Sequence, residues 1–409
     1  MTTIGKDPKW IKKVDDNYQV NFTALSDDGR VCITGTSVFM GTGDFSVLCY
    51  DSQGNLIWKD PLGENVYSGV FWVAISGNGK IGAAGGDYQA KGRGFIRIYE
   101  IEKGSRALVE FDTPARVNEV EISQDGSYVV CVSENILYLF SRTGESYELT
   151  TKIEEGNDPY FRSIGISKDG KYVIAGAQYY DEKLQYTKGT VYLFKNDNGK
   201  LTLINQPWQG ASGILRVVSS ETGSFLAAST NKGEVHLFQL DYFERTSQPL
   251  WTYKPDVYDW GIAYPLAIAT PSDGEVYVAS GANIFPLDYA KPNYVFMLQN
   301  MPEKTESGYS PKLLWMDEVP YFPDPGMNMD KEARLLTVTM GEPTEHGKET
   351  PGYFYLYDAL SGNKHWIYGP VQKMDWPMAI NPSGSAIFGG DDGGNLYYWG
   401  APASEGDAK

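Results

Sequence analysis

A pattern of apolar and polar positions recurs along the chain: an apolar run, a polar segment that ends in glycine, and a second apolar run. In the first copy, Phe22 to Leu25 precede Ser26-Asp27-Asp28-Gly29, and Val31 to Thr34 follow. The other copies share a glycine at the end of the polar segment, namely Gly79, Gly126, Gly170, Gly223, Gly274 and Gly384. Short apolar runs on both sides of an Asp-Gly turn are typical of antiparallel strands. The pattern therefore predicts two paired strands in each copy of a repeat.

The turn glycines set the length of the repeat. Successive gaps between them are 50, 47, 44, 53, 51 and 110 residues, so the last gap is about twice the others. Met327 to Leu336 lies inside that gap and keeps the apolar–polar–apolar pattern without the glycine. We expect a degenerate copy there, which gives eight units. Seven is the alternative if the sixth and seventh units merge.

Each unit has room for two further strands. In the first unit, Ser46 to Tyr50 and Leu56 to Trp58 are separated by the turn segment Ser52-Gln53-Gly54-Asn55. The third run alternates aliphatic and aromatic residues in later units, as in Ile136-Leu137-Tyr138-Leu139-Phe140. A period of two suits a strand that packs on both faces between neighbouring sheets. Four antiparallel strands repeated radially form a β-propeller.

We therefore predict an all-β protein, an eight-bladed β-propeller of four-stranded antiparallel blades over residues 1–400, followed by a polar tail over 401–409. The blades are expected to begin near residues 20, 70, 117, 161, 214, 265, 327 and 376. The last unit ends after its third strand, Leu396 to Trp399. Trp10 to Val14 is a suitable outer strand at the other end of the chain, so we expect it to complete the last blade and close the ring.

Two units resemble the quinoprotein (PQQ-type) repeat, within the WD40-like eight-bladed β-propeller superfamily. In Leu356–Trp366 and Tyr50–Trp58, a strand reaches an Asp, a Gly turn follows, and a Trp lies four residues after the Gly. The resemblance implies that this Trp docks between neighbouring blades. The family includes quinone-dependent dehydrogenases, which carry an adjacent Cys pair, and non-catalytic assembly scaffolds. The cysteines here are separate (Cys32, Cys49 and Cys131), so the resemblance implies no quinone cofactor.

Composition and charge narrow the classes of partner. The chain has 35 Lys and Arg against 52 Asp and Glu, a formal net charge of −17. Nucleic acid and anionic membranes are excluded as main partners, because phosphates are held by clustered basic residues. No apolar run approaches the roughly 18 residues of a membrane span, so we expect no membrane insertion. The first ten residues lack the apolar core of a signal peptide, which favours a cytoplasmic protein. A secreted chain whose signal has been removed would have the same features.

Catalytic chemistry finds little support in the motifs. The three histidines, His236, His346 and His365, are not at metal-ligand spacing. Nucleophile-elbow, phosphate-loop and zincin motifs are absent. We therefore expect no catalytic residue, no metal and no cofactor, and favour a non-enzymatic protein.

Loop lengths predict a binding face instead. The connections between second and third strands are long at 36–45, 85–94, 177–189, 281–293 and 341–352, and they share one face with the connections between units. Aromatic and charged residues near that face are the candidate binding residues: Tyr67, Trp72, Arg116, Arg162, Arg216, Tyr258, Trp260, Asp375 and Trp376. Tyr, Trp and Arg carry much of the energy of protein interfaces. The leading hypothesis is a scaffold that presents this face to a protein partner, and such a scaffold can be a subunit of a larger complex.

The alternative is an enzyme or small-ligand binder that uses the central channel. Arg116, Arg162 and Arg216 stand at similar heights in three successive units and would receive a small anionic ligand, since guanidinium groups suit carboxylate and phosphate. A structural interpretation of the same arginines is pairing with channel carboxylates such as Glu119.

Overall fold

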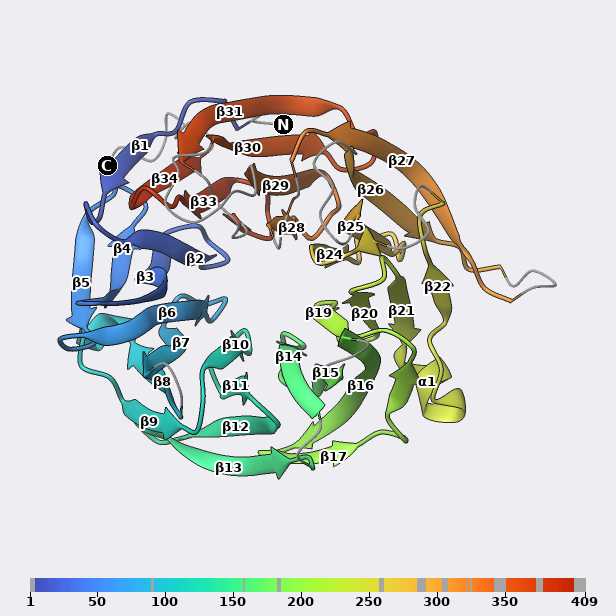
Figure 1. Ribbon diagram of the computed structural model, residues 1–409, viewed down its shortest axis with the longest axis horizontal. Helices are drawn as coiled ribbons and strands as arrows, with labels where there is room; N and C mark the ends of the chain where they lie inside the picture. The colour runs from blue at the N-terminus through green and yellow to red at the C-terminus, as the bar shows by residue number, and fades with distance from the viewer. Residues whose placement is uncertain are drawn as a thin grey trace.

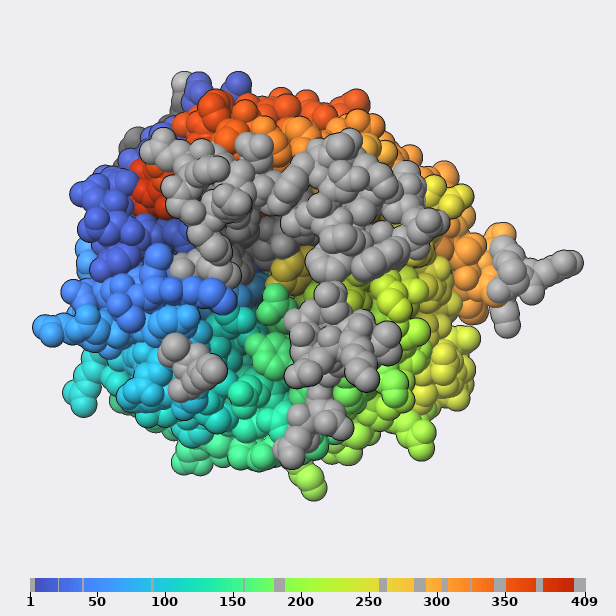
Figure 2. All heavy atoms as spheres, in the orientation of Figure 1, coloured from blue at the N-terminus to red at the C-terminus, as the bar shows by residue number. Residues whose placement is uncertain are grey.

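The computed structural model describes residues 4–400 except 90–91, 157–158, 182–184, 257–260, 285–291, 304–307, 322, 324–325, 342–350 and 373–377. Its sheets are arranged radially about one axis in chain order (Figure 1). The N-terminal strand lies beside the last C-terminal strands, and the all-atom view shows the same juxtaposition of blue and red atoms (Figure 2). The predicted all-β propeller fold is confirmed.

The strands occupy four radial positions. The innermost strands are β2 (Gln19–Leu25), β6 (Val66–Ile75), β10 (Val117–Ile122), β14 (Pro159–Ile166), β19 (Ile214–Ser219), β24 (Leu266–Ala269), β28 (Met327–Met329) and β32 (Ala379–Ile380). The second strands are β3 (Val31–Gly43), β7 (Ile81–Gln89), β11 (Tyr128–Ser133), β15 (Tyr172–Asp181), β20 (Phe225–Thr230), β25 (Tyr277–Ile284), β29 (Leu335–Gly341) and β33 (Ala386–Gly390).

The third strands are β4 (Ser46–Asp51), β8 (Arg93–Glu100), β12 (Ile136–Thr143), β16 (Gln185–Asp197), β21 (Val235–Gln239), β26 (Asn293–Asn300), β30 (Pro351–Asp358) and β34 (Asn395–Gly400). The outer strands are β5 (Leu56–Pro61), β9 (Val109–Thr113), β13 (Ser146–Glu154), β17 (Lys200–Leu203), β22 (Trp251–Tyr253), β27 (Pro311–Val319), β31 (Lys364–Gln372) and β1 (Trp10–Lys13). Additional elements are β18 (Trp208–Gly210), β23 (Gly261–Ile262), helix α1 (Leu240–Thr246) and a 3-10 turn (Ile101–Lys103).

Hydrogen bonding joins the described strands into seven sheets rather than eight. The reason is that β3 pairs with β6 as well as with β2 and β4, which merges the first two groups into one eight-stranded sheet. The number of blades therefore stays a prediction from the repeat, and so do the domain limits.

The recurring Ser-x-Asp-Gly segment forms the turn between first and second strands. In the first copy, Ser26 Oγ donates to Asp28 Oδ1 at 2.7 Å and accepts the Val31 N–H at 3.0 Å. Asp28 also accepts the Arg30 N–H at 2.9 Å. All seven turn glycines adopt a positive φ, between +63° and +86°, which favours residues without a Cβ. The motif is therefore a backbone requirement of the turn.

The degenerate copy keeps the same turn with different residues. β28 pairs with β29, and Ala333 takes the place of glycine with a φ of +50°. Asp330 replaces the serine: its buried carboxylate accepts the N–H groups of Arg334 and Leu335 at 2.7 and 2.8 Å. The predicted copy between Met327 and Leu336 is confirmed.

Closure by the N-terminal strand is also confirmed. β1 pairs antiparallel with β34, with Trp10 opposite Tyr398 and Lys13 opposite Asn395. The Trp10 ring stacks on Tyr398 with 5.4 Å between ring centroids. Its Nε1 donates to the Ser52 carbonyl of the first unit at 2.9 Å, so the strand also ties the last unit to the first.

Outer-strand tryptophans join neighbouring units, as the quinoprotein resemblance implies. Each donates its indole N–H to the following unit or to the N-terminal segment: Trp58 to Ile101 O at 3.2 Å, Trp251 to Asn300 Oδ1 at 2.9 Å, Trp315 to Ala359 O at 2.8 Å and Trp366 to Ile4 O at 3.1 Å. These bonds fix the angle between units without a covalent link.

The core lies between the sheets, and all three cysteines are buried in it. Cys32, Cys49 and Cys131 are free thiols with no exposed surface. Burial raises the pKa of each thiol, that of Cys49 to about 12. The described part of the chain has no helix long and apolar enough to cross a membrane.

Candidate functional site

The inner strands place side chains on two faces and in a central channel. Each innermost strand ends at the turn that joins it to the second strand of its unit, so we call that side of the ring the turn face. The strands begin on the opposite side, the loop face, where the connections between units and the long connections between second and third strands lie. Residues at the start of an inner strand therefore line the rim of the loop face.

An arginine and a tyrosine on this rim are held by one buried amide. Asn118, with 2% of its surface exposed, accepts hydrogen bonds at Oδ1 from Arg116 Nε at 3.2 Å and from the Tyr160 hydroxyl at 2.9 Å. Its own Nδ2 donates to the Phe161 carbonyl at 2.7 Å. The Arg116 guanidinium carbon also lies 4.0 Å from the ring centroid of Phe71. Arg116, Tyr160 and Phe71 all remain partly exposed.

A second pair continues the rim across non-neighbouring units. Arg162 Nη2 donates to the Tyr264 hydroxyl at 2.9 Å, and its guanidinium carbon lies 5.4 Å from that ring centroid. Both side chains are partly exposed. We call these five residues, Phe71, Arg116, Tyr160, Arg162 and Tyr264, the rim arc.

The other predicted binding residues lie in different environments. Tyr67 is partly exposed at the start of β6, opposite Thr42 of β3. Trp72 and Arg216 are buried, with 2% and 8% of their surface exposed, and Arg216 lines the central channel. Four further predicted residues lie outside the described part of the chain: Tyr258, Trp260, Asp375 and Trp376.

Trp72 and Arg216 belong to a cluster that crosses the channel. The Arg216 guanidinium carbon lies 4.3 Å from the Trp72 ring centroid. The Trp72 ring stacks on Phe22, with 3.6 Å between the ring centroids. Arg216 Nη1 forms an ion pair with Glu119 Oε1 at 3.2 Å. We call Phe22, Trp72, Glu119, Ser163 and Arg216 the channel plug.

Glu119 is the most heavily bonded member of the plug. Its Oε2 accepts hydrogen bonds from the Ser163 hydroxyl and from the Ile164 N–H, the latter at 3.2 Å. Ser163 Oγ in turn accepts the Val217 N–H at 2.9 Å. Burial raises the pKa of Glu119, while Arg216 and these hydrogen bonds oppose the rise. Both carboxylate oxygens of Glu119 therefore have a hydrogen-bond or ion-pair partner.

All five plug residues hold the same place in their units, four residues before the turn serine or its equivalent. A register shift interrupts the ladder at or just before this level in these five units, for example between Val70 and Trp72 and between Ile214 and Arg216. β-bulges redirect the side chains that follow them. The bulge therefore turns these residues into the channel, and the sequence pattern alone does not reveal it.

The three predicted channel arginines do not converge on one site. Arg216 pairs with Glu119, as the structural interpretation of these residues expects, while Arg162 contacts Tyr264 and Arg116 contacts Asn118 and Phe71. Arg162 also attracts Glu119, so two of the three arginines act on the same carboxyl group, and binding of an anionic ligand by these arginines stays a prediction.

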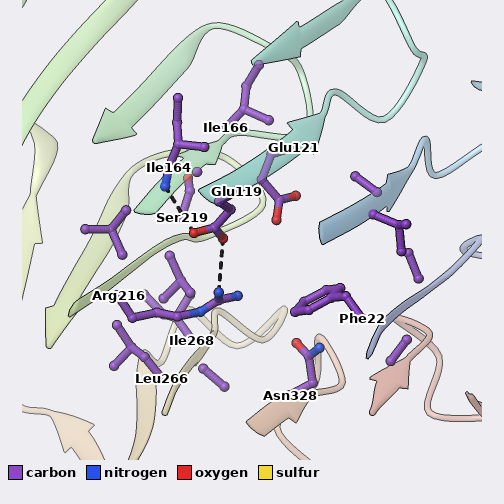
Figure 3. A pocket seen from close by; sticks show the side chains of 18 of the residues that line it. Phe22, Glu119, Glu121, Ile164, Ile166, Arg216, Ser219, Leu266, Ile268 and Asn328 are labelled. Carbon is purple, nitrogen blue, oxygen red and sulfur yellow. Dashed lines mark hydrogen bonds and ion pairs between the residues drawn. The ribbon is translucent and has the colours of Figure 1, made fainter. Parts of the chain in front are cut away.

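A cavity of about 270 Å³ lies in the channel, bounded by residues of all the innermost strands from β2 to β32 (Figure 3). Many of its lining residues are aliphatic, such as Leu25, Ile75, Ile166, Val218, Ile268 and Ile380, but the surface exposed in the cavity is more polar than apolar. Glu119, Glu121 and Arg216 are the charged residues among its lining. Burial and the neighbouring Glu119 raise the pKa of Glu121 to about 8, an effect that Arg216 and Trp72 reduce.

On the turn face, the turns of several units bond to one another. Asp27 Oδ2 contacts Lys168 Nζ at 3.2 Å and Gln124 Nε2 at 3.1 Å, although these residues come from the first, third and fourth units. Lys168 also pairs with Glu221 at 2.8 Å. These bonds lie two residues beyond the cavity walls at Leu25 and Ile166.

The described histidines have structural or exposed positions. His236 is buried and its Nδ1 lies 2.8 Å from Thr252 Oγ1. Burial lowers its pKa to about 4. His365 is exposed, and His346 lies outside the described residues. Within the described ranges, no group of three or more His, Cys, Asp or Glu side chains is placed to hold a metal ion.

Comparisons with known proteins agree with this architecture. No protein-family model and no curated protein matches the sequence. Among solved structures, the β-propeller domain of Cps50 (Swd1) from Myceliophteria thermophila matches with a TM-score of 0.55 and 11% identity, over 97% of this chain and 100% of that domain. The chain is a β-propeller. At this identity the likeness establishes the propeller fold alone, and the quinoprotein-type relationship stays a prediction.

Proposed function

We propose that this propeller is a non-enzymatic binding protein whose loop face holds a protein partner, as a subunit of a larger complex. The rim arc is the observation that carries the proposal. It presents two arginines and three aromatic rings, partly exposed, from several different units. These residue types dominate the energy of protein interfaces.

The rim arc is fixed before any partner arrives. Asn118 holds Arg116 and Tyr160, and Arg162 and Tyr264 hold each other. Ordering a free arginine on binding costs about 0.5–1.5 kcal/mol, so side chains that are already held bind at lower cost. Guanidinium groups in such positions favour carboxylates or backbone carbonyls on the partner.

The same sequence and structure disfavour other classes of function. Propellers include enzymes and scaffolds alike, so the fold does not decide between these two classes of function. Among the described residues, no group of three or more His, Cys, Asp or Glu side chains could hold a metal ion, and the net charge of −17 opposes nucleic acid. The indole bonds between units support a place among the non-catalytic quinoprotein-type scaffolds. Free buried thiols support a reducing compartment, and we propose the cytoplasm.

The test compares two double variants on opposite faces of the ring, each of which replaces two arginines with alanine. Arg116→Ala with Arg162→Ala alters the rim arc. Arg30→Ala with Arg106→Ala removes two exposed arginines near the turn face. Each tagged variant is expressed in the source organism, and co-purifying proteins are quantified by mass spectrometry after thermal unfolding has shown that both variants are folded.

We expect the rim variant to lose a stoichiometric partner that the wild type and the turn-face variant retain. Retention of every partner by the rim variant would falsify the assignment of the loop face. Equal loss from both variants would also contradict it, because the effect would not depend on the face.

A further inference from the structure

We propose that the channel cavity binds a small organic cation, an ammonium or amidinium group on a compact body, with Glu121 as its counter-ion. This site is separate from the rim arc and does not depend on the partner proposed above. It rests on the charge balance of the cavity, on the character of its walls and on the place of Glu121 in the repeat.

The charges that line the cavity do not balance. Among its described lining residues, Glu119, Glu121 and Arg216 are charged. Arg216 is committed to Glu119, with 3.2 Å between Nη1 and Oε1, and its guanidinium lies against the Trp72 ring. Arg216 also attracts Glu121, which accepts a hydrogen bond from Trp72, so one lining arginine faces two lining carboxyl groups. Figure 3 shows the Glu121 carboxyl pointing into the cavity.

A carboxylate in this setting must be neutralised. Burial of a carboxylate beside a second carboxylate, Glu119, is costly, so the group takes up either a proton or a cation. With a pKa of about 8, the Glu121 carboxyl is mostly protonated near neutral pH. A bound cation would replace that proton, so binding releases it to solvent.

The repeat does not require a carboxylate at this place. Glu121 stands two residues before the turn serine, and the same position in four other units holds a small or aliphatic residue: Ala24, Ala74, Gly165 and Val218. These units form the same inner strand and the same turn. Folding therefore does not explain the charge, whereas recognition of a cation does.

The walls favour an organic cation over a metal ion. Ca²⁺ takes about 6–8 oxygen ligands, whereas the described lining is mostly Ile, Leu, Val and Ala. The exposed surface of the cavity is more polar than apolar, so a ligand can also form hydrogen bonds there. Here Asn328 faces the cavity from β28, and the ring of Phe22 lies beside it (Figure 3). A volume of about 270 Å³ suits a compact ligand.

Four probes of similar shape and different charge test the proposal on the full chain. Benzylammonium and benzamidinium carry the cation, benzyl alcohol is neutral and benzoate is anionic. Binding is measured by isothermal titration calorimetry near pH 7 in two buffers that differ in ionisation enthalpy. The expected result is 1:1 binding of one or both cations, with proton release, and no binding of the alcohol or of benzoate.

Two matched variants locate the site. Glu121→Gln mimics the protonated carboxyl, so the fold is expected to persist, and affinity for the cation should fall about tenfold or more with loss of a charge-assisted bond. Glu148→Gln makes the same change on the exposed outer strand β13 of the same unit and should bind like the wild type.

Four outcomes overturn the proposal. They are the failure of both cations to bind, equal binding of benzyl alcohol, binding of benzoate instead, and full affinity in Glu121→Gln. The proton release is measured on the wild type, so this readout decides the question even if the variant fails to fold.

Discussion

The guanidinium of Arg216 lies 4.3 Å from the ring centroid of Trp72, although the two residues come from β19 and β6 of different units. The same guanidinium pairs with Glu119 of β10. One arginine therefore links three inner strands across the channel. The plug is a structural feature of the centre of the ring, and it leaves the rim arc and the channel cavity as the two candidate sites.

Breaking the plug should destabilise the protein. Arg216→Met leaves Glu119 buried without its cation, which costs about 3–5 kcal/mol in comparable pairs. The measurement is the free energy of unfolding from urea denaturation. The double variant Glu119→Gln with Arg216→Met should recover part of the loss, because no uncompensated charge remains. A single variant within about 0.5 kcal/mol of the wild type would contradict the account.

The degenerate turn offers a stabilising substitution. Ala333 has a φ of +50°, where an L-residue with a Cβ is disfavoured by roughly 1–2 kcal/mol. Ala333→Gly should therefore raise the free energy of unfolding by about 0.5–1 kcal/mol after the greater entropy of the unfolded glycine is allowed for. The control is Ala267→Gly in strand β24, which should lower stability. A lower melting temperature for Ala333→Gly would show that the position is not strained.

Stability should fall as the pH rises through the titration of Glu121. Its pKa is about 8 in the folded protein and lies near that of an ordinary carboxyl when unfolded. The folded state then binds more protons than the unfolded state between these values, so the free energy of unfolding decreases with increasing pH up to about 8. Glu121→Gln should flatten urea-denaturation free energies over roughly pH 6 to 8, and Glu148→Gln should not. An unchanged slope in Glu121→Gln would assign the effect to other groups.

The N-terminal strand should control opening of the ring. Trp10→Ala removes the stack on Tyr398 and the bond to Ser52. We expect a loss of about 2–4 kcal/mol, near the lower range for truncation of a large aromatic, since Trp10 is partly exposed. Hydrogen exchange should become faster in β34 and β1 first. Uniformly faster exchange in all units would show instead that the ring opens as a whole.

The sequence predicts those parts of the molecule that local chemistry determines. The Ser26–Gly29 turn, the degenerate copy at Asp330 and the closing strand at Trp10 each follow from short patterns, because every hydrogen bond that defines them is local or repeats with the unit. The indole bond of Trp58 follows from the resemblance to a known repeat.

The channel could not be predicted in the same way. The position of Trp72 in the sequence predicts a place on the loop face, yet the side chain is buried after the bulge between Val70 and Trp72, and Phe71 is left partly exposed at the rim. The pairing of Arg216 with Glu119 joins positions almost a hundred residues apart. Which side chains meet across the ring depends on bulges in separate units, and no single segment carries that information.

Native mass spectrometry on protein purified gently from its own source tests the central claim, that the loop face holds a protein partner. The account predicts a complex for the wild type and for Arg30→Ala with Arg106→Ala, and a bare chain for Arg116→Ala with Arg162→Ala. A wild type that appears only as the bare chain, or a rim variant that keeps the complex, would contradict it.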